Sequence, residues 1–176
     1  MADHLLPPYG GVLVDVVVDD ERASELRKAS TYWPSWDLTP RHLCDLELLL
    51  SGAFSPLRGF LGSADVASVC ADMRLSDGTL WPMPVTLDVP DELATQVGPG
   101  ASVALRDPEG VMLAALHVGE VYRPDRRAEA QAVFGTTDPA HPGVAHLLER
   151  THPNYLAGTV EGIQLPAHYE LSLRAA

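Results

Sequence analysis

Positive charge is scarce in this sequence. Twelve Lys and Arg residues stand against 24 Asp and Glu residues, which gives a formal net charge of −12. Such a chain repels a phosphate backbone and lacks the cations whose binding releases counterions from nucleic acid. The composition therefore disfavours RNA or DNA as a partner.

Long apolar segments and a cleavable leader are also missing. No run of about 18 apolar residues occurs, so no membrane-spanning helix is predicted. No basic start followed by an apolar run precedes Pro7-Pro8, so no secretory signal is predicted either. We expect a soluble, cytoplasmic protein with no membrane partner.

Cysteine is rarer still, with two residues in the chain. Neither Cys44 nor Cys70 belongs to a C-x-x-C pair or has a histidine at the spacing of a zinc site. Because free cysteines are usually buried, we interpret both as small core residues rather than redox or metal-binding groups.

The remaining composition is that of an ordinary globular domain. Hydrophobic residues make up 46% of the chain and charged residues 20%. A length of 176 residues suits one domain with a substantial core. We therefore expect a single domain over residues 1–176.

Capping residues and helical spacing predict several short helices. Thr39 followed by Pro40 starts the clearest one, whose leucines recur at helical spacing until Gly52. Acidic residues at 19–21 precede a surface helix at 23–29, and Ser63 is predicted to cap another helix. Two more are expected at 126–134, after Asp125, and at 142–148.

β-branched and alternating segments predict the strands. They lie at 13–18, 85–89, 102–105, 111–118 and 155–164, with a hairpin turn at 107–110. The first is Val-rich and is expected to be buried on both faces. Segment 32–36 is too short for a regular element, and 54–62 is predicted to be a compact loop. Without regular βαβ alternation, we predict an α+β fold with a curled or barrel-like, mostly antiparallel sheet and several short flanking helices.

Two groups of residues invite comparison with ligand sites. His141, His146 and His152 could in principle hold zinc, but their spacing does not place them on one helical face, so capping and surface roles are preferred. The glycines at 52, 59 and 62, with Ser55 and Arg58, could cradle a phosphate. Because no G-x-x-x-x-G-K-[ST] or G-x-G-x-x-G pattern is present, we interpret them as a structural loop.

Acid–base and nucleophilic chemistry find no clear candidates. Asp45 and Glu47, with Asp37 nearby, could be paired catalytic carboxylates, but residues two apart on a helix point to different sides. We interpret them as solvated. No serine lies in G-x-S-x-G, so no hydrolase triad is predicted.

The one local concentration of positive charge is Arg123, Arg126 and Arg127. It could dock an acidic partner or an anion, although salt bridges with Asp125 and Glu129 are the plainer interpretation. If further domains are present, this segment is our first choice for an interdomain contact.

The large aromatic side chains Trp33, Trp36 and Trp81 are expected to be core or interface anchors, because such residues dominate cores and interfaces. A ligand-stacking role is a weaker alternative.

Four motifs, taken in order, carry a family resemblance. They are GAFSPLRGFL at 52–61, MRLSDGTLWP at 73–82, YRPD at 122–125 and VFGTTDPAHPG at 133–143. Together they resemble the amino-terminal, PUA-like domain of ATP sulfurylase (sulfate adenylyltransferase). The resemblance extends from Leu6 to Tyr169 and implies a PUA-like fold.

In that family the domain precedes a catalytic domain that binds MgATP and sulfate and forms adenosine 5′-phosphosulfate and pyrophosphate. The family's Gln-x-Arg-Asn and His-x-x-His motifs have no counterpart here. The resemblance therefore implies an inactive domain with no catalytic, cofactor-binding or metal-binding residue of its own. Its expected partner is the catalytic domain in cis, with a homo-oligomer as a further possibility.

Two alternatives stay open. One is a free-standing PUA-like module that binds a small ligand or RNA, and the other is a separately encoded subunit that pairs with a catalytic partner in trans. Whether the parent protein also carries an adenylylsulfate kinase domain is not decided by the sequence.

Overall fold

A computed structural model describes residues 7–167, and the ends of the resemblance at Leu6 and Tyr169 lie outside this range. Its centre is a six-stranded sheet in the order β1-β4-β5-β6-β2, with β3 also paired to β6. The strands are β1 (Ser35–Asp37), β2 (Gly59–Phe60), β3 (Leu87–Val89), β4 (Ser102–Arg106), β5 (Met112–Tyr122) and β6 (Asn154–Gly162). Only the β1–β4 pair is parallel. The predicted α+β class and mostly antiparallel sheet are confirmed, but the sheet stays open and does not close into a barrel.

Strands β4 and β5 form the predicted hairpin. The Asp107 carboxylate accepts the backbone N–H of Val111 at 2.7 Å, and Gly110 takes a positive φ of 86° that closes the turn. Strand β5 continues beyond the predicted end and pairs with β6 as far as Tyr122, across a bulge at Gly119. Near the start of β6, Tyr155 lines the cavity described below.

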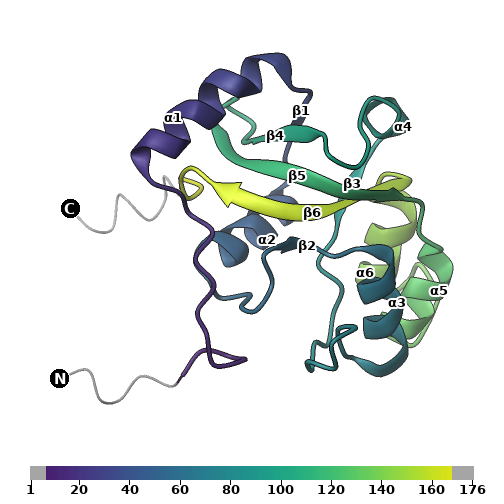
Figure 1. Ribbon diagram of the computed structural model, residues 1–176. Helices are drawn as coiled ribbons and strands as arrows, with labels where there is room; N and C mark the ends of the chain where they lie inside the picture. Colours follow the sequence, from purple (N-terminus) through teal and green to yellow (C-terminus); the bar gives the residue numbers. More distant parts are fainter. Residues whose placement is uncertain (1–6, 168–176) are drawn as a thin grey trace, which may run out of the picture.

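Helices cover both faces of the sheet (Figure 1). Helix α1 (Asp20–Ala29) is capped by the Asp19 carboxylate and buries Ala23 and Leu26 against small residues of β4 and β5. Helix α2 (Pro40–Leu50) packs Leu46, Leu49 and Leu50 into the larger cluster on the opposite face. Both helices begin and end close to the predicted positions.

The remaining helices gather at one end of the sheet (Figure 1). They are α3 (Ser63–Asp72), α5 (Arg126–Phe134) and α6 (Pro142–Ala145), which continues as a π-helical turn η2 (His146–Arg150). Asp125 caps α5 and Gly135 ends it, as predicted. Ser63 does not cap α3, because Gly62 holds that position, and the Ser63 hydroxyl instead donates to Glu120 at 2.5 Å. Two short helices were not predicted: η1 (Ser30–Tyr32) and α4 (Asp91–Ala94).

The strand predicted at 13–18 is wrong. Val17 forms a single bridge to Gly162, and the segment alternates between buried Val14 and Val16 and exposed Leu13 and Val17. Only one side of the segment is covered, so its Val content reflects half-burial rather than a central strand.

Two short segments join the sheet against expectation. Ser35–Asp37 forms β1 within a region predicted to be irregular, and Gly59–Phe60 forms β2 within the predicted loop. Each pairs with a strand remote in sequence, β4 and β6 respectively, so no local pattern could reveal the pairing.

Cysteine burial was also predicted wrongly for one residue. Cys44 is exposed on α2, and Cys70 is partly buried on α3. Position 44 is two residues before the buried Leu46 and so lies on the outer side of the helix.

Candidate functional site

The three histidines considered for zinc do not converge. His141 caps α6 through Nδ1 and lies against the Phe134 ring, whereas the His152 ring meets Trp36 edge-on at 5.2 Å. His146 belongs to η2 and lines a cavity. Within residues 7–167, no three His, Cys, Asp or Glu side chains are arranged to hold a metal ion.

The glycines considered for a phosphate cradle serve close backbone packing. A Cβ at Gly59 would lie 2.0 Å from the carbonyl oxygen of Gly158, which explains the glycine in β2. Gly52 has a positive φ of 75°. A Cβ at Gly62 would meet the Glu120 carboxylate at 2.9 Å, and a carboxylate repels phosphate. The surroundings thus favour the structural interpretation.

The candidate carboxylates differ in their surroundings. Asp45 pairs with Arg41 on the same helix at 3.1 Å, and burial, opposed by the Arg41 charge, raises the pKa of Asp45. Asp37 occupies an exposed position of β1, and Glu47 lies two residues beyond Asp45 on α2. The prediction that these carboxylates are solvated is wrong for Asp45, whose side chain is only 17% exposed.

The arginine group makes different contacts from those predicted. Arg126 donates to the carbonyl oxygen of Thr151 at 2.7 Å, and Arg123 lies 3.9 Å from Asp91 at the surface. The predicted salt bridges with Asp125 and Glu129 are wrong, because the Asp125 carboxylate caps α5 and Glu129 is hydrogen-bonded elsewhere.

The tryptophans pack as predicted. Trp81 is buried and meets Phe54 edge-on, with their ring centroids 5.6 Å apart. Trp36 packs against the larger hydrophobic cluster, which includes the leucines of α2. Trp33 packs against the smaller cluster, which includes Ala23 and Leu26 of α1. Trp36 Nε1 is buried and has no hydrogen-bond partner among residues 7–167.

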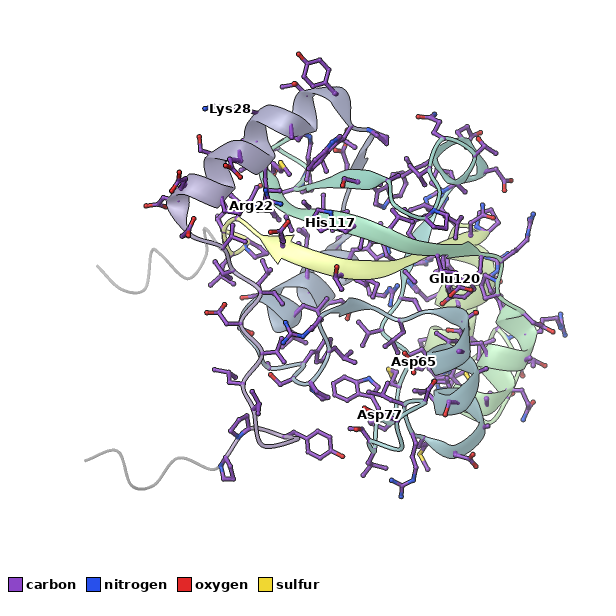
Figure 2. All side chains as sticks on the ribbon, viewed as in Figure 1. Arg22, Lys28, Asp65, Asp77, His117 and Glu120 are labelled. Carbon is purple, nitrogen blue, oxygen red and sulfur yellow. The ribbon has the colours of Figure 1, made fainter. Side chains whose placement is uncertain are left out.

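Strands β4, β5 and β6 bring Ser102, His117 and Glu161 together in an order that no motif predicted. Ser102 Oγ lies 3.1 Å from His117 Nδ1, and His117 Nε2 lies 2.5 Å from Glu161 Oε2. However, Arg22 of α1 donates to the same carboxylate through Nε and Nη2, each at 2.9 Å. Figure 2 labels Arg22 and His117, the two residues that share it. Hydrogen bonds from Arg22 first, and then from His117, lower the pKa of Glu161 to about 2 against a weaker opposing effect of burial. We interpret these hydrogen bonds as structural, because they link α1 to strands β5 and β6. We do not interpret the three residues as a hydrolytic triad.

A buried polar network, also missed from the sequence, joins α2 to β3. His42 Nδ1 accepts the N–H of Thr39 to complete a capping box, so the ring proton lies on Nε2 and is donated to Asp88 Oδ1 at 2.7 Å. The backbone N–H of His152 donates to Asp88 Oδ2 at 2.8 Å, and Arg41 lies 3.4 Å from Oδ1. Burial by itself would raise the pKa of Asp88, but these interactions, that of His42 foremost, lower it to about 2.

One signal could have revealed this network. Asp88 lies inside an apolar strand, and a buried carboxylate needs partners because an unpaired charge is costly to desolvate. The partner itself could not have been named from local spacing.

Beside this network lies a cavity of about 230 Å³. It is bounded by α2, α5, α6, η2, strand β6 and the chain before β3, and most of its lining surface is apolar. The lining residues are Arg41, Met83, Pro84, Thr86, Glu129, Val133, Phe134, Gly143, His146, Leu147, Thr151 and Tyr155. It is our candidate site, because it combines an enclosing apolar wall with a few polar groups.

Two buried groups at this cavity are coupled. The Tyr155 hydroxyl donates to Glu129 Oε2 at 3.1 Å. Burial raises the pKa of Glu129, although the Tyr155 hydrogen bond opposes this effect. Burial, with the nearby Glu129 charge, raises the pKa of Tyr155 as well, so the phenol keeps its proton at neutral pH. Because its phenol stays protonated, Tyr155 is not an activated nucleophile. The cavity has room for a ligand, but this pair of groups does not equip it for nucleophilic catalysis.

Fold and site define a small α+β domain built on an open, mixed sheet. The chain belongs to the PUA-like domain family, whose profile matches residues 6–165. The PUA-like fold implied by the motifs is therefore confirmed. None of the helices in residues 7–167 is long and apolar enough to span a bilayer.

Longer proteins contain a closely similar segment. The chain is 45% identical over 172 residues to the sulfate adenylyltransferase of Eremothecium gossypii, covering 97% of this chain and 34% of that protein. With the sulfate adenylyltransferase of Saccharomyces cerevisiae it shares 44% identity over 168 residues, covering 93% and 32% respectively. The chain thus spans about a third of the length of these relatives, and the resemblance stated from the motifs is confirmed.

A solved structure agrees. "Hexameric APS kinase from Thiobacillus denitrificans" superposes with a TM-score of 0.74 and 35% sequence identity, covering 96% of this chain and 29% of that chain. This likeness supports the domain fold and, again, a match to only part of a longer polypeptide.

Proposed function

We propose that this chain acts as the non-catalytic, amino-terminal domain of a sulfate adenylyltransferase. In this role it packs on a catalytic domain that converts ATP and sulfate to adenosine 5′-phosphosulfate and pyrophosphate during sulfate assimilation. One observation carries the proposal: 45% identity across 97% of the chain covers only 34% of the relative.

In this proposal, the catalytic domain supplies the chemistry. MgATP and sulfate bind there, and no residue of this chain touches the reacting groups. The surroundings of its motifs support this division, because Gly59 serves strand packing and Gly62 faces a carboxylate rather than a phosphate. Fold kinship alone does not carry activity, which resides in sites.

The contact with the catalytic domain is proposed to include the arginine segment. The Arg123 side chain is 68% exposed, and Arg127 is also exposed, so both can reach acidic groups of a neighbouring domain. Assembly into a homo-oligomer, in the cytoplasm, is part of the same proposal.

A chimeric enzyme tests this role. The segment of the Saccharomyces cerevisiae sulfate adenylyltransferase that matches this chain is replaced by it, and sulfate-dependent pyrophosphate release is measured. We expect the chimera to be active, while the same enzyme without the segment and this chain alone are not. Turnover by this chain alone would show that it contains a catalytic site. A folded chimera no more active than the deletion would contradict the accessory role.

Charge variants refine the test. In the chimera, Arg123→Ala with Arg127→Ala is expected to weaken domain association, seen as a lower thermal midpoint and lower activity. Arg74→Ala is the control, because its guanidinium bonds within its own turn to the carbonyl oxygen of Gly78. Equal behaviour of both variants would remove this segment from the interface.

The open alternatives can be separated cheaply. A reading frame that continues past the codon for Ala176 into Gln-x-Arg-Asn and His-x-x-His motifs would support the role in cis. A stop codon, with co-sedimentation of this chain and a catalytic subunit, would support pairing in trans.

A further inference from the structure

The cavity beside α5 contains a buried carboxyl group, that of Glu129, with few direct polar contacts. Glu129 is only 9% exposed and lines the cavity, yet its side chain has one hydrogen-bond partner among residues 7–167, the Tyr155 hydroxyl. None of the ion pairs formed by the described residues includes Glu129. An ionised carboxylate that is buried without a cation in direct contact is unfavourable, so a cation bound against Glu129 would stabilise its charged form.

The two neighbouring arginines, Arg41 and Arg126, are hydrogen-bonded to groups other than Glu129. Arg41 is held by Asp45 at 3.1 Å and Asp88 at 3.4 Å, and it also donates to the Thr86 carbonyl oxygen. Arg126 donates to the carbonyl oxygens of Thr151 and Leu147. The charges of Arg41 and Arg126 do act on Glu129 from a distance and oppose the effect of burial on its pKa, whereas the Asp88 charge adds to that effect. The carboxylates of Asp45, Asp88 and Glu129 thus share two arginines, and the group has one negative charge in excess when all three are ionised.

The walls of the cavity select the rest of the ligand. Met83, Val133, Phe134 and Leu147 provide an apolar surface, and the volume is about 230 Å³. An apolar cavity of ~150 Å³ is sufficient for benzene, so a slightly larger planar molecule fits here.

From this geometry we propose that the cavity binds a small organic cation, with an amidinium or primary ammonium group against Glu129 and an apolar body against Val133 and Phe134. This site is separate from the proposed role in sulfate activation and does not depend on it. The charged head would form the direct ion pair that neither Arg41 nor Arg126 makes with Glu129, and the body would displace water from the apolar wall.

The bound cation should also make Glu129 ionise more readily. Burial raises the pKa of Glu129 in the free protein, and a cation at hydrogen-bonding distance favours the charged form. Binding near the free-state pKa is therefore expected to release protons, which buffers of different ionisation enthalpy detect in a calorimeter.

Benzamidine and benzamide form a matched pair of probes, because they share shape and differ in charge. Titrated into the whole chain at neutral pH, benzamidine is expected to bind saturably and at least about tenfold more tightly than benzamide. Amide chemical-shift changes should cluster around Thr86, Phe134 and Leu147. Equal binding of the two probes, no binding, or shifts scattered over the acidic surface would each overturn the proposal.

Two variants test whether binding needs the Glu129 carboxylate and the free volume of the cavity. Glu129→Gln keeps an acceptor for the Tyr155 hydroxyl and is expected to weaken benzamidine binding at least about tenfold while leaving benzamide unaffected. Glu109→Gln, the same change in the exposed hairpin turn, is the control and should bind as wild type. Should Glu129→Gln not fold, Val133→Phe fills the cavity without removing charge and is expected to block benzamidine. Retained binding in a folded variant of either kind would refute the site.

Discussion

Replacing Asp88 with Asn tests whether the buried network stabilises the fold. Asp88 is 3% exposed, and its carboxylate receives hydrogen bonds from His42, Arg41 and the backbone N–H of His152. Asn has nearly the same size, so the change removes the charge without opening a cavity. Any loss of stability therefore reports on the electrostatics of the network.

The magnitude follows from the pKa of Asp88, which is lowered from 3.8 to about 2. Such a difference corresponds to about 2 kcal/mol, and breaking a buried charge pair costs about 3–5 kcal/mol in other proteins. We expect Asp88→Asn to lower the free energy of unfolding by about 2–4 kcal/mol at neutral pH.

The pH dependence gives a second, independent readout. Because the folded-state pKa is depressed, the stabilisation is complete above the unfolded value of 3.8 and is lost as the pH falls through about 2. The stability difference between wild type and Asp88→Asn should therefore be constant near neutrality and shrink as the pH falls from about 5 to about 2.

Urea unfolding followed by tryptophan fluorescence measures both effects, with the slopes compared to verify that the transition is unchanged. Asp77→Asn is the matched control, since Asp77 lies in an exposed turn and Asn still accepts the N–H of Thr79. It should unfold at the wild-type midpoint. If Asp88→Asn also unfolds there, or if its difference from wild type is independent of pH, the reasoning about the network is wrong.

Three further changes test local packing by the same unfolding measurement. Gly59→Ala places a Cβ 2.0 Å from the Gly158 carbonyl oxygen and should cost about 1–3 kcal/mol. Gly98→Ala, where nothing lies within 4 Å, should cost less, and similar losses would argue against the close approach. Leu46→Ala removes a fully buried side chain and should cost about 2–5 kcal/mol, whereas Leu48→Ala, 38% exposed, should cost under about 1 kcal/mol. Thr39→Ala removes the cap of α2 and should cost about 1 kcal/mol; an unchanged midpoint would show that the capping box does not stabilise the helix.

Residues of the candidate site, such as Glu129 and His146, drew attention in the sequence, but for roles other than lining this cavity. The aromatic anchors Trp36 and Trp81 could be assigned to the core from their size, and the structure confirms this. Glu129 was expected to take part in surface salt bridges, because its position in α5 follows a basic run. Its burial against Tyr155 depends on how α5 packs on β6, and no pattern within the helix reports that packing.

The Val-rich segment at 13–18 is a case in which the sequence predicted a strand that the structure does not form. Its composition is typical of a strand, but a strand also needs a partner along its length. The available partner is the end of β6, where Val18 and Val16 bond only to Gly162. The Val-rich composition fits the burial of every second residue. It does not show whether a neighbouring strand is available along the whole segment.

The sequence by itself determined where helices α2 and α5 begin, where the β4–β5 hairpin turns, and which family the chain belongs to. Caps, turns and helical spacing act between residues a few positions apart, so they can be read along the chain. Only the tertiary structure decided that Gly59 pairs with Thr159 of β6, that His42 donates to Asp88, and that Glu129 lines a cavity. These features join groups far apart in the sequence, and their energies arise from burial and close approach that exist only after the chain has folded.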